Sequence, residues 1–204
     1  MRLSRLLAPL AAATVFVGSA SAGIAAGTAS PAQPGLSSVA SLRIDNFGQM
    51  SPTYFRGGQP EGRDYADLAA LGVKTVINLT SDDADASEPS MAKQAGLSYV
   101  QIPMTTHTVP TTAQLEQFLS IVNDPTRQPV FVHCVGGRHR TGVMTAAYRM
   151  SHDGWPADRA FQEMKQFKFG ADFLHAEFKD FVYGYVAMPR APVQAVKTEA
   201  RVGA

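Results

Sequence analysis

Ten consecutive residues, HCVGGRHRTG from His133 to Gly142, gather groups that can carry out nucleophilic chemistry. They include Cys134, the only cysteine in a chain of 204 residues, and Arg140 six positions after it. A loop of this length before a helix can turn successive backbone N–H groups inward and hold a tetrahedral anion at the helix N-terminus. The pattern therefore predicts a thiol beside a binding site for an oxyanion such as phosphate.

The side chains of this loop each have an expected part in that chemistry. A helix N-terminus and neighbouring cations lower a thiol pKa from about 8.5 to roughly 3.5–7.5, so we expect Cys134 to be largely a thiolate nucleophile. Arg140 presents a planar fork that matches two phosphate oxygens. Thr141 can donate its hydroxyl to the sulfur, and His133 is expected to brace the loop by hydrogen bonds. The predicted substrate-binding residues are Val135, Gly136, Gly137, Arg138, His139 and Arg140.

Two other interpretations of the cysteine are weaker. A cysteine that ends a core strand is often merely buried, but burial gives no reason for the glycines and cationic side chains that follow. A zinc site would have to use His133, Cys134 and His139, and no Cys-x-x-Cys pair or fourth ligand stands at a usual spacing. We therefore expect neither a metal nor a cofactor.

Short runs rich in β-branched and aromatic residues predict the strands that position this loop, and each is followed by a segment of helical spacing. One helix is expected to open with a capping box made by Thr111 and Gln114. The strands are expected at residues 73–79, 97–102 and 129–134, and the helices at residues 87–95, 111–122, 139–150, 160–168 and 174–185.

Strands that alternate with helices predict a single α/β domain, in which a central, mostly parallel sheet is flanked by helices on both faces. Ligands of such sheets collect at the carboxyl ends of the strands. Residues 80–85, residues 103–108 and the loop after Cys134 should therefore share one rim of the sheet.

The decapeptide resembles the H-C-x-x-G-x-x-R-[ST]-G signature of the cysteine-dependent protein tyrosine and dual-specificity phosphatases. The resemblance extends from Tyr54 to about Tyr185 and includes YFRGGQP, LAALGVKTVINL and GVMTAAYRM, which look like bacterial members of the dual-specificity group. It implies a phosphotyrosine-phosphatase-like fold and hydrolysis of phosphomonoesters of tyrosine, serine or threonine through a phosphocysteine at Cys134. The implied partner is a phosphorylated protein.

The G-x-H-R-T-G variant, which begins at Gly137, is also similar to plant and fungal atypical enzymes that act on inositol pyrophosphates. The resemblance therefore also allows a small phosphorylated metabolite, such as an inositol phosphate, as the substrate.

Related phosphatases place an aspartate on a neighbouring loop to protonate the leaving oxygen, and the corresponding loop here, PMTTHTVPTT, has no carboxylate. His107 in that loop and Asp82 or Asp83 on the preceding rim are candidates for the general acid, and the choice among them stays open. An alcohol or phenolate leaving group needs this proton in the transition state, whereas a phosphate leaving group is already a stable anion. A missing general acid would therefore favour activated substrates such as phosphoanhydrides or aryl phosphates.

Two functions of other classes compete with a phosphatase. The same loop could hold a phosphorylated ligand without turnover, although no group needed for attack is missing. A sulfur-transfer enzyme also uses a cysteine in a loop of N–H groups, but it gives no reason for Arg140 and Thr141.

The first 22 residues are typical of a secretory signal peptide, because two arginines precede a short apolar run and the triplet Ala-Ser-Ala. A retained membrane anchor is the alternative, but the run falls short of the roughly 20 apolar residues that span a bilayer. We expect a periplasmic or secreted protein without a membrane partner after cleavage, and the net charge of +1 gives no argument for nucleic acid. The predicted parts are the signal peptide at 1–22, a flexible leader at 23–40, the phosphatase domain at 41–186 and a loose tail at 187–204.

Overall fold

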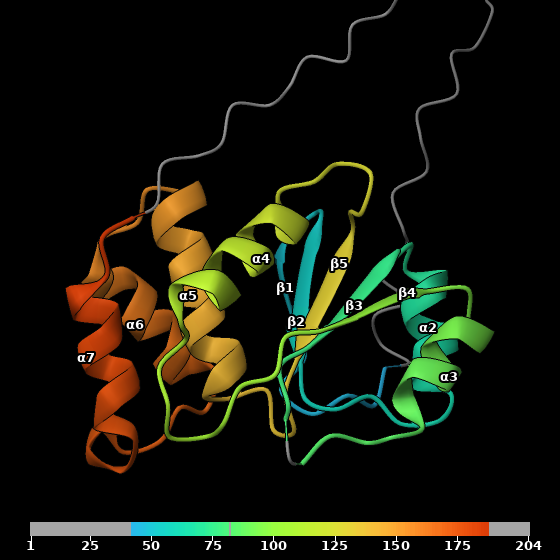
Figure 1. Cartoon of the computed structure of the whole chain (residues 1–204), viewed down its shortest axis with the longest axis horizontal. Helices are drawn as coiled ribbons and strands as arrows, with labels where there is room; N and C mark the ends of the chain where they lie inside the picture. Colours follow the sequence, from blue (N-terminus) through green and yellow to red (C-terminus); the bar gives the residue numbers. More distant parts are fainter. Residues whose placement is uncertain (1–41, 82, 188–204) are drawn as a thin grey trace, which may run out of the picture. The chain divides into compact units, whose positions relative to one another are not determined.

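A five-stranded sheet lies at the centre of the computed structural model, which describes residues 42–81 and 83–187 (Figure 1). The strand order is β1-β2-β5-β3-β4. β1 runs antiparallel to β2 and every other neighbouring pair is parallel, which confirms the mostly parallel sheet. The strands are β1 (Gly48–Ser51), β2 (Tyr54–Gly57), β3 (Thr75–Asn78), β4 (Ser98–Gln101) and β5 (Val130–His133).

The three expected strands contain β3, β4 and β5, but the sequence did not indicate β1 and β2. β2 carries the sequence YFRG, in which an arginine and a glycine break the apolar run, and yet all four residues are buried. β5 pairs with β2 on one side and with β3 on the other. The strand that leads to Cys134 is therefore the central strand of the sheet, and it is covered from both faces.

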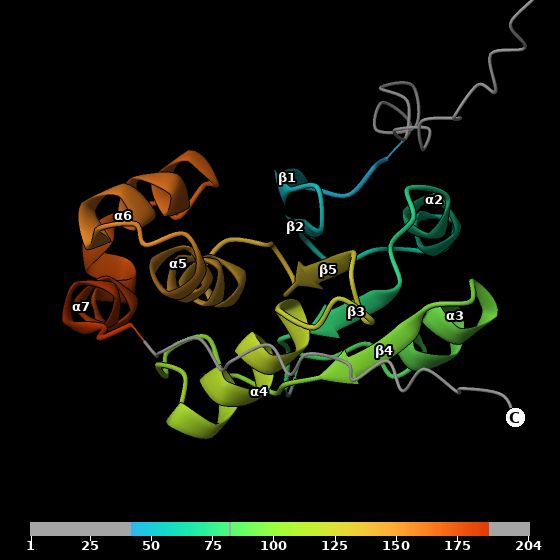
Figure 2. The ribbon, with the colours of Figure 1, turned by 90° about the horizontal axis from the view of Figure 1, so that it is seen from above.

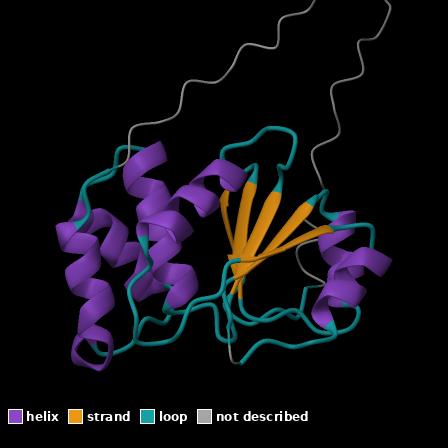
Figure 3. Ribbon diagram, in the orientation of Figure 1, coloured by secondary structure: helices purple, strands orange, loops and turns teal. Residues whose placement is uncertain are grey.

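Helices cover both faces of the sheet, as the alternating pattern predicts (Figures 2 and 3). Val76 and Phe131 pack with α2 and α3 on one face, while Ile77, Val130 and Val132 pack with α4, α5, α6 and α7 on the other. The helices are α2 (Asp64–Ala70), α3 (Glu88–Gln94), α4 (Thr112–Val122), α5 (Arg140–His152), α6 (Ala157–Gln166) and α7 (Ala176–Gly184), with the short 3-10 helix η1 (Asp172–His175) before α7.

The two last helices begin or end differently from the prediction. α6 ends at Gln166 rather than at Lys168, because Lys168 adopts a left-handed conformation with φ of 59°. The segment from residue 174 begins in η1, where Leu174 is exposed rather than packed in the core. The loop between α6 and α7 therefore passes close to the start of α5.

The capping box at the start of α4 is confirmed. The hydroxyl of Thr111 accepts from the backbone N–H of Gln114, whose side-chain oxygen in turn accepts from the backbone N–H of Thr111 at 2.8 Å. The side-chain amide of Gln114 also donates to the carbonyl of Pro103 at 2.6 Å. One side chain thus caps the helix and fixes the loop that carries His107.

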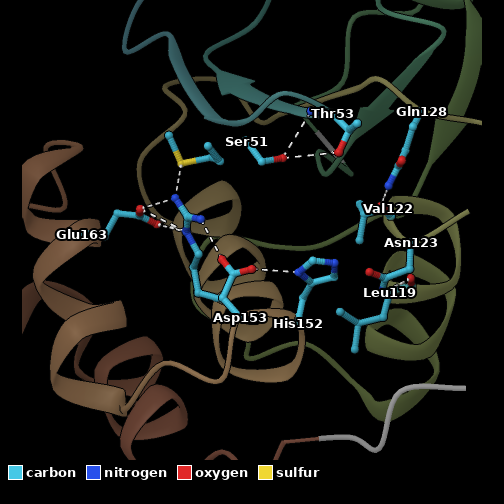
Figure 4. Close-up of polar contacts among 11 residues, drawn as sticks. Ser51, Thr53, Leu119, Val122, Asn123, Gln128, His152, Asp153 and Glu163 are labelled. Atoms are coloured by element: carbon cyan, nitrogen blue, oxygen red, sulfur yellow. Dashed lines mark hydrogen bonds and ion pairs between the residues drawn. The ribbon is translucent and has the colours of Figure 1, made fainter. Parts of the chain in front are cut away.

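A buried arginine joins the end of α5 to α6 (Figure 4). Arg149 donates through Nη2 to Glu163 at 2.7 Å and through Nη1 to Asp153 at 2.7 Å, and Asp153 also contacts the ring of His152. The guanidinium stacks on Trp155, with its carbon 4.3 Å from the ring centroid. This network fixes the far end of the helix whose first residue is Arg140.

Several predictions fall on residues outside those that the structure describes. They are the signal peptide at 1–22, the leader at 23–40, the tail beyond residue 187 and Asp82. Among the described residues, no helix has both the length and the apolar character needed to cross a membrane.

Candidate active site

Cys134 follows β5 directly and is 3% exposed at the base of the loop that leads into α5. The carbonyl groups of this loop point away from the sulfur and are held from outside. Val135 O accepts from the backbone N–H of Gln59 at 3.0 Å, and Gly137 O accepts from the side chains of Asn46 and Arg56. Within the described chain, the N–H groups of residues 135–139 donate no backbone hydrogen bond, so they are free to bind an anion.

Gly137 makes this conformation possible. Its φ is +62°, in the left-handed region that side chains rarely adopt, and a Cβ there would lie 2.4 Å from the carbonyl carbon and oxygen of Gly57. The loop therefore packs directly on the end of β2. Gly136 has no positive φ, so of the two predicted glycines only Gly137 is needed for a left-handed turn.

Arg56 is a functional candidate that sequence reasoning did not assign. It is fully buried on β2 and donates through Nη2 to Gly137 O at 2.5 Å, while its guanidinium carbon lies 4.2 Å from the ring centroid of Phe167. Burial lowers the pKa of Arg56, and the charge of Cys134 opposes that shift. A buried arginine side chain therefore holds the loop that follows Cys134 from outside. The signal was available in YFRGGQP, where an arginine stands inside an apolar segment.

Arg140, the first residue of α5, is held in place by three hydrogen bonds. Nη1 and Nη2 donate to the two carboxylate oxygens of Asp83 at 2.8 and 2.6 Å, and Nη1 also donates to Met104 O at 3.1 Å. These contacts bring residues after β3, β4 and β5 together, as the shared rim predicts, and Figure 1 shows the three loops at the same edge of the sheet.

The pairing of Arg140 leaves one edge of its guanidinium for a ligand. A guanidinium has five N–H donors in a fixed plane, and Asp83 and Met104 take three of them. The remaining two, on Nε and Nη2, point along the same side, and Nε is buried without a partner among the described residues. Two parallel donors on one edge match two oxygens of a phosphate.

The candidates for a general acid occupy different surroundings. Hydrogen bonds from Arg140 hold the pKa of the Asp83 carboxyl below its ordinary value, so this group is ionised at neutral pH and has no proton to donate. Asp82 lies outside the described residues. His107 is exposed, and its Nδ1 lies 3.4 Å from Glu177 Oε1. The identity of the general acid therefore stays a prediction, and His107 is the described candidate that is not held by Arg140.

His133 and Thr141 lie on opposite sides of the cysteine in sequence, and both are fully buried. His133 Nε2 lies 2.7 Å from Glu88 Oε1, and the other oxygen of Glu88 accepts from Asn78 at 2.5 Å. This chain of contacts ties the end of β5 to the start of α3. Thr141 Oγ1 has no partner within the described part of the chain, which leaves it available to the sulfur.

Arg138 and His139 were both predicted to bind the substrate, but the structure places their side chains differently. The ring of His139 turns toward α7, with Nε2 3.0 Å from Phe169 O and its centroid 3.7 Å from that of His175. Only its backbone remains available to an anion. Arg138 is exposed and lies 3.6 Å from Asp45, which also binds Lys168 at 2.7 Å.

A cleft of about 1070 Å³ opens beside the loop, between Val135 and the residues that follow β3. Six of its twelve lining residues are acidic and two are basic. The acidic residues are Asp45, Glu61, Asp64, Asp67, Asp83 and Asp85. The cleft beside the loop is therefore rich in carboxylates, of which Asp45, Asp67 and Asp83 are paired with cations.

Known proteins are similar to this chain in both sequence and fold. A family model described as DSP-PTPase phosphatase fused to NAD+ kinase matches residues 39–178. The chain is 32% identical over 146 residues to the dual specificity protein phosphatase TpbA of Pseudomonas aeruginosa, which covers 72% of this chain and 65% of TpbA. It therefore spans less than two thirds of the length of that relative.

Two solved structures extend the comparison. The crystal structure of a cysteine-to-serine variant of P. aeruginosa TpbA in complex with phosphotyrosine has a TM-score of 0.59 at 30% identity, covering 68% of this chain and 83% of that one. The catalytic core of the PP-IP phosphatase SIW14 from Saccharomyces cerevisiae, in complex with citrate, has a TM-score of 0.62 at 25% identity, covering 72% and 89%.

Gly137→Ala should destabilise the protein by more free energy than its backbone conformation alone would cost. A methyl group at φ near +60° costs about 1–2 kcal/mol, and at Gly137 it would also press on the backbone of Gly57. We expect urea denaturation to show a loss of more than ~2 kcal/mol, with loss of tungstate binding in calorimetry. Gly154→Ala is the matched control, because Gly154 has φ of +68° and open space around it. Equal losses for the two variants, with tungstate binding intact, would contradict the close packing.

Proposed function

The chain belongs to the family of DSP-PTPase phosphatases, and on that premise we propose that it hydrolyses phosphomonoesters through a phosphocysteine intermediate. The observation that carries the proposal is Arg140, whose Nε and Nη2 edge is not used by Asp83 or Met104 and whose side chain interacts with Cys134, in a loop whose carbonyls at Val135 and Gly137 are held from outside. Arrangements of donors that are fixed before the reaction stabilise charge as it develops in the transition state.

The reaction follows from these contacts in two displacements. Cys134 Sγ attacks phosphorus while Arg140 and the N–H groups of residues 135–140 bind the three non-bridging oxygens, and the leaving oxygen takes its proton from solvent or from the general acid, for which His107 is the described candidate. Water then attacks the phosphocysteine and passes a proton back to that group or to solvent, and phosphate leaves as the sulfur recovers its electron pair. Thr141 can donate to the sulfur during this second step, because its hydroxyl is buried and uncommitted.

Aryl phosphomonoesters such as phosphotyrosine are the substrates that we favour. A phenolate is a better leaving group than an alkoxide, which suits a site where the loop after β4 has no carboxylate to donate a proton. The acidic lining of the neighbouring cleft also disfavours a densely charged polyphosphate and favours a peptide with basic residues near the phosphate. The TpbA variant in complex with phosphotyrosine supports the same choice.

An inositol pyrophosphate is the second candidate substrate. The likeness to SIW14, whose name describes a PP-IP phosphatase, supports it. A phosphate leaving group is already a stable anion, so a missing general acid would matter little. The two candidate substrates should interact with the cleft in opposite ways. Its carboxylates would repel a polyphosphate and attract a basic peptide.

Export of the mature protein is a further part of the proposal, and it rests on the pattern of residues 1–22. Mass spectrometry of the protein recovered from its producing cell would test it, since cleavage predicts a chain that begins at Gly23.

Cys134→Ser should abolish turnover of p-nitrophenyl phosphate and keep tungstate binding, because serine lacks the nucleophile and preserves the loop. His152→Ala is the control, since His152 lies at the opposite end of α5. Tungstate binding by a wild-type protein that releases no phosphate from aryl esters would indicate a binding module. Conversion of thiosulfate with cyanide, without phosphate release, would indicate a sulfur-transfer enzyme.

Asp83→Asn should raise KM for an aryl phosphate about tenfold, because charge-assisted hydrogen bonds contribute about 1.5–3 kcal/mol and position Arg140. Asp85→Asn is the matched control, because it removes the same charge from the same loop while the Asp85 carboxylate accepts hydrogen bonds from Ser87 and none from Arg140. The basic limb of the pH-rate profile should stay in place in both variants, since Asp83 is already ionised there. Equal effects of the two substitutions would show that charge alone matters.

Comparison of kcat/KM should separate the substrate classes. We expect a phosphotyrosine peptide with flanking lysines to exceed the matched phosphoserine peptide by about 10²-fold or more, the usual range of general-acid assistance. It should also exceed the phosphotyrosine peptide with flanking glutamates. A higher value for an inositol pyrophosphate than for every peptide would select the second candidate.

A further inference from the structure

Two imidazoles and a carboxylate converge next to the phosphate loop, apart from the groups that bind the oxyanion. His107 comes from the loop between β4 and α4, His175 ends η1, and Glu177 lies in the first turn of α7. His107 Nδ1 is 3.4 Å from Glu177 Oε1, and His175 Nδ1 is 3.5 Å from the same oxygen. All three potential donor atoms lie within 4.8 Å of one another.

These separations suit a small metal ion. Donor atoms about 2.0–2.1 Å from zinc at tetrahedral angles lie about 3.3 Å apart. The two nitrogen-to-oxygen distances are already close to that value. The rings of His107 and His175 are stacked with centroids 5.0 Å apart, so a modest rotation of the exposed His107 would bring its nitrogen to the third position.

Two of these donor atoms are shielded from solvent. His175 is 12% exposed and Glu177 is 31% exposed, and both His175 Nδ1 and Glu177 Oε1 are buried atoms. They form an ion pair at 3.5 Å, which is longer than an ordinary hydrogen bond. A cation held between them would contact both atoms at coordination distance, whereas His107, at 73% exposed, would leave the site open to solvent.

We propose that His107, His175 and Glu177 bind one divalent transition metal, with Zn²⁺ as the reference ion. The ligands are the two Nδ1 atoms and Glu177 Oε1, and water occupies a fourth position on the open side of His107. Two imidazoles and one carboxylate suit Zn²⁺, Ni²⁺ or Cu²⁺, whereas Mg²⁺ and Ca²⁺ require oxygen ligands.

Metal binding at this place would connect three segments that are distant in sequence. It joins the loop after β4 to the start of α7, and the ring of His139 lies 3.7 Å from that of His175. His139 immediately precedes Arg140, so the rings of His175 and His139 would lie between the metal and the segment that begins with the phosphate-binding arginine. It would also engage His107, the described candidate for the proton donor, through Nδ1. The inference rests on ligand geometry and is independent of the reaction that the chain performs.

Calorimetric titration with ZnCl2 tests the site in the full chain with the Cys134→Ser substitution, because a free thiol would itself bind zinc. We expect one saturable zinc per chain at pH 7.5, no saturation by MgCl2, and a higher melting temperature in zinc. Affinity should fall as the pH is lowered, because protons compete with the metal for the ligand atoms.

Two substitutions in the same background identify the ligands. His175→Phe keeps a ring in contact with His139 and removes the nitrogen, and Glu177→Gln keeps the shape and removes the charge. Removal of a group that only hydrogen-bonds to a metal ligand already weakens metal affinity about 10- to 100-fold. Each substitution removes a ligand itself, so each should weaken the affinity for zinc at least ~10-fold.

His152→Ala is the control for these variants, because His152 also faces a carboxylate, that of Asp153, on another surface, and it should leave the affinity unchanged. Comparable melting temperatures without zinc would show that all of the variants fold. Absence of saturable binding, or undiminished binding by both ligand variants, would overturn the proposal.

Discussion

The site depends on the outward direction of two carbonyl groups. Val135 O and Gly137 O are held by donors that come from outside the loop, namely Gln59, Asn46 and Arg56. Because each peptide unit turns as a plane, a carbonyl fixed outward keeps the N–H group of the next residue inward. The electrostatic character of the pocket is therefore determined by hydrogen bonds on its outer side, and the segment that includes β2 provides most of them.

The sequence pattern predicted those elements of the fold that depend mainly on residues close to them in the chain. The apolar runs indicated β3, β4 and β5, and Thr111 with Gln114 marked the start of α4, because strand burial and helix capping depend on neighbouring residues. β2 was missed because its arginine is accommodated by contacts with Gly137 and Phe167, which lie far along the chain. No spacing rule could have revealed those contacts.

The same reasoning explains the mixed outcome at the site. Cys134 and Arg140 belong to one short motif, so the sequence alone placed them together. The pairing of Arg140 with Asp83, and the turn of His139 toward His175, depend on how three loops meet at one rim. The convergence of His107 with His175 and Glu177 likewise follows no ligand motif, since almost seventy residues separate the first histidine from the other two.

The packing of Gly137 on Gly57 has a consequence for how this chain can vary. Both positions are confined. A side chain at Gly137 would meet the backbone of Gly57, and a side chain at Gly57 would meet the side chains of Ile44 and Phe131. Consider a library that randomises both codons. A larger residue at either position cannot be accommodated by a smaller residue at the other, since glycine is already the smallest residue. Diversity that alters substrate preference should therefore accumulate along the outer cleft, while this pair of positions stays invariant among functional clones.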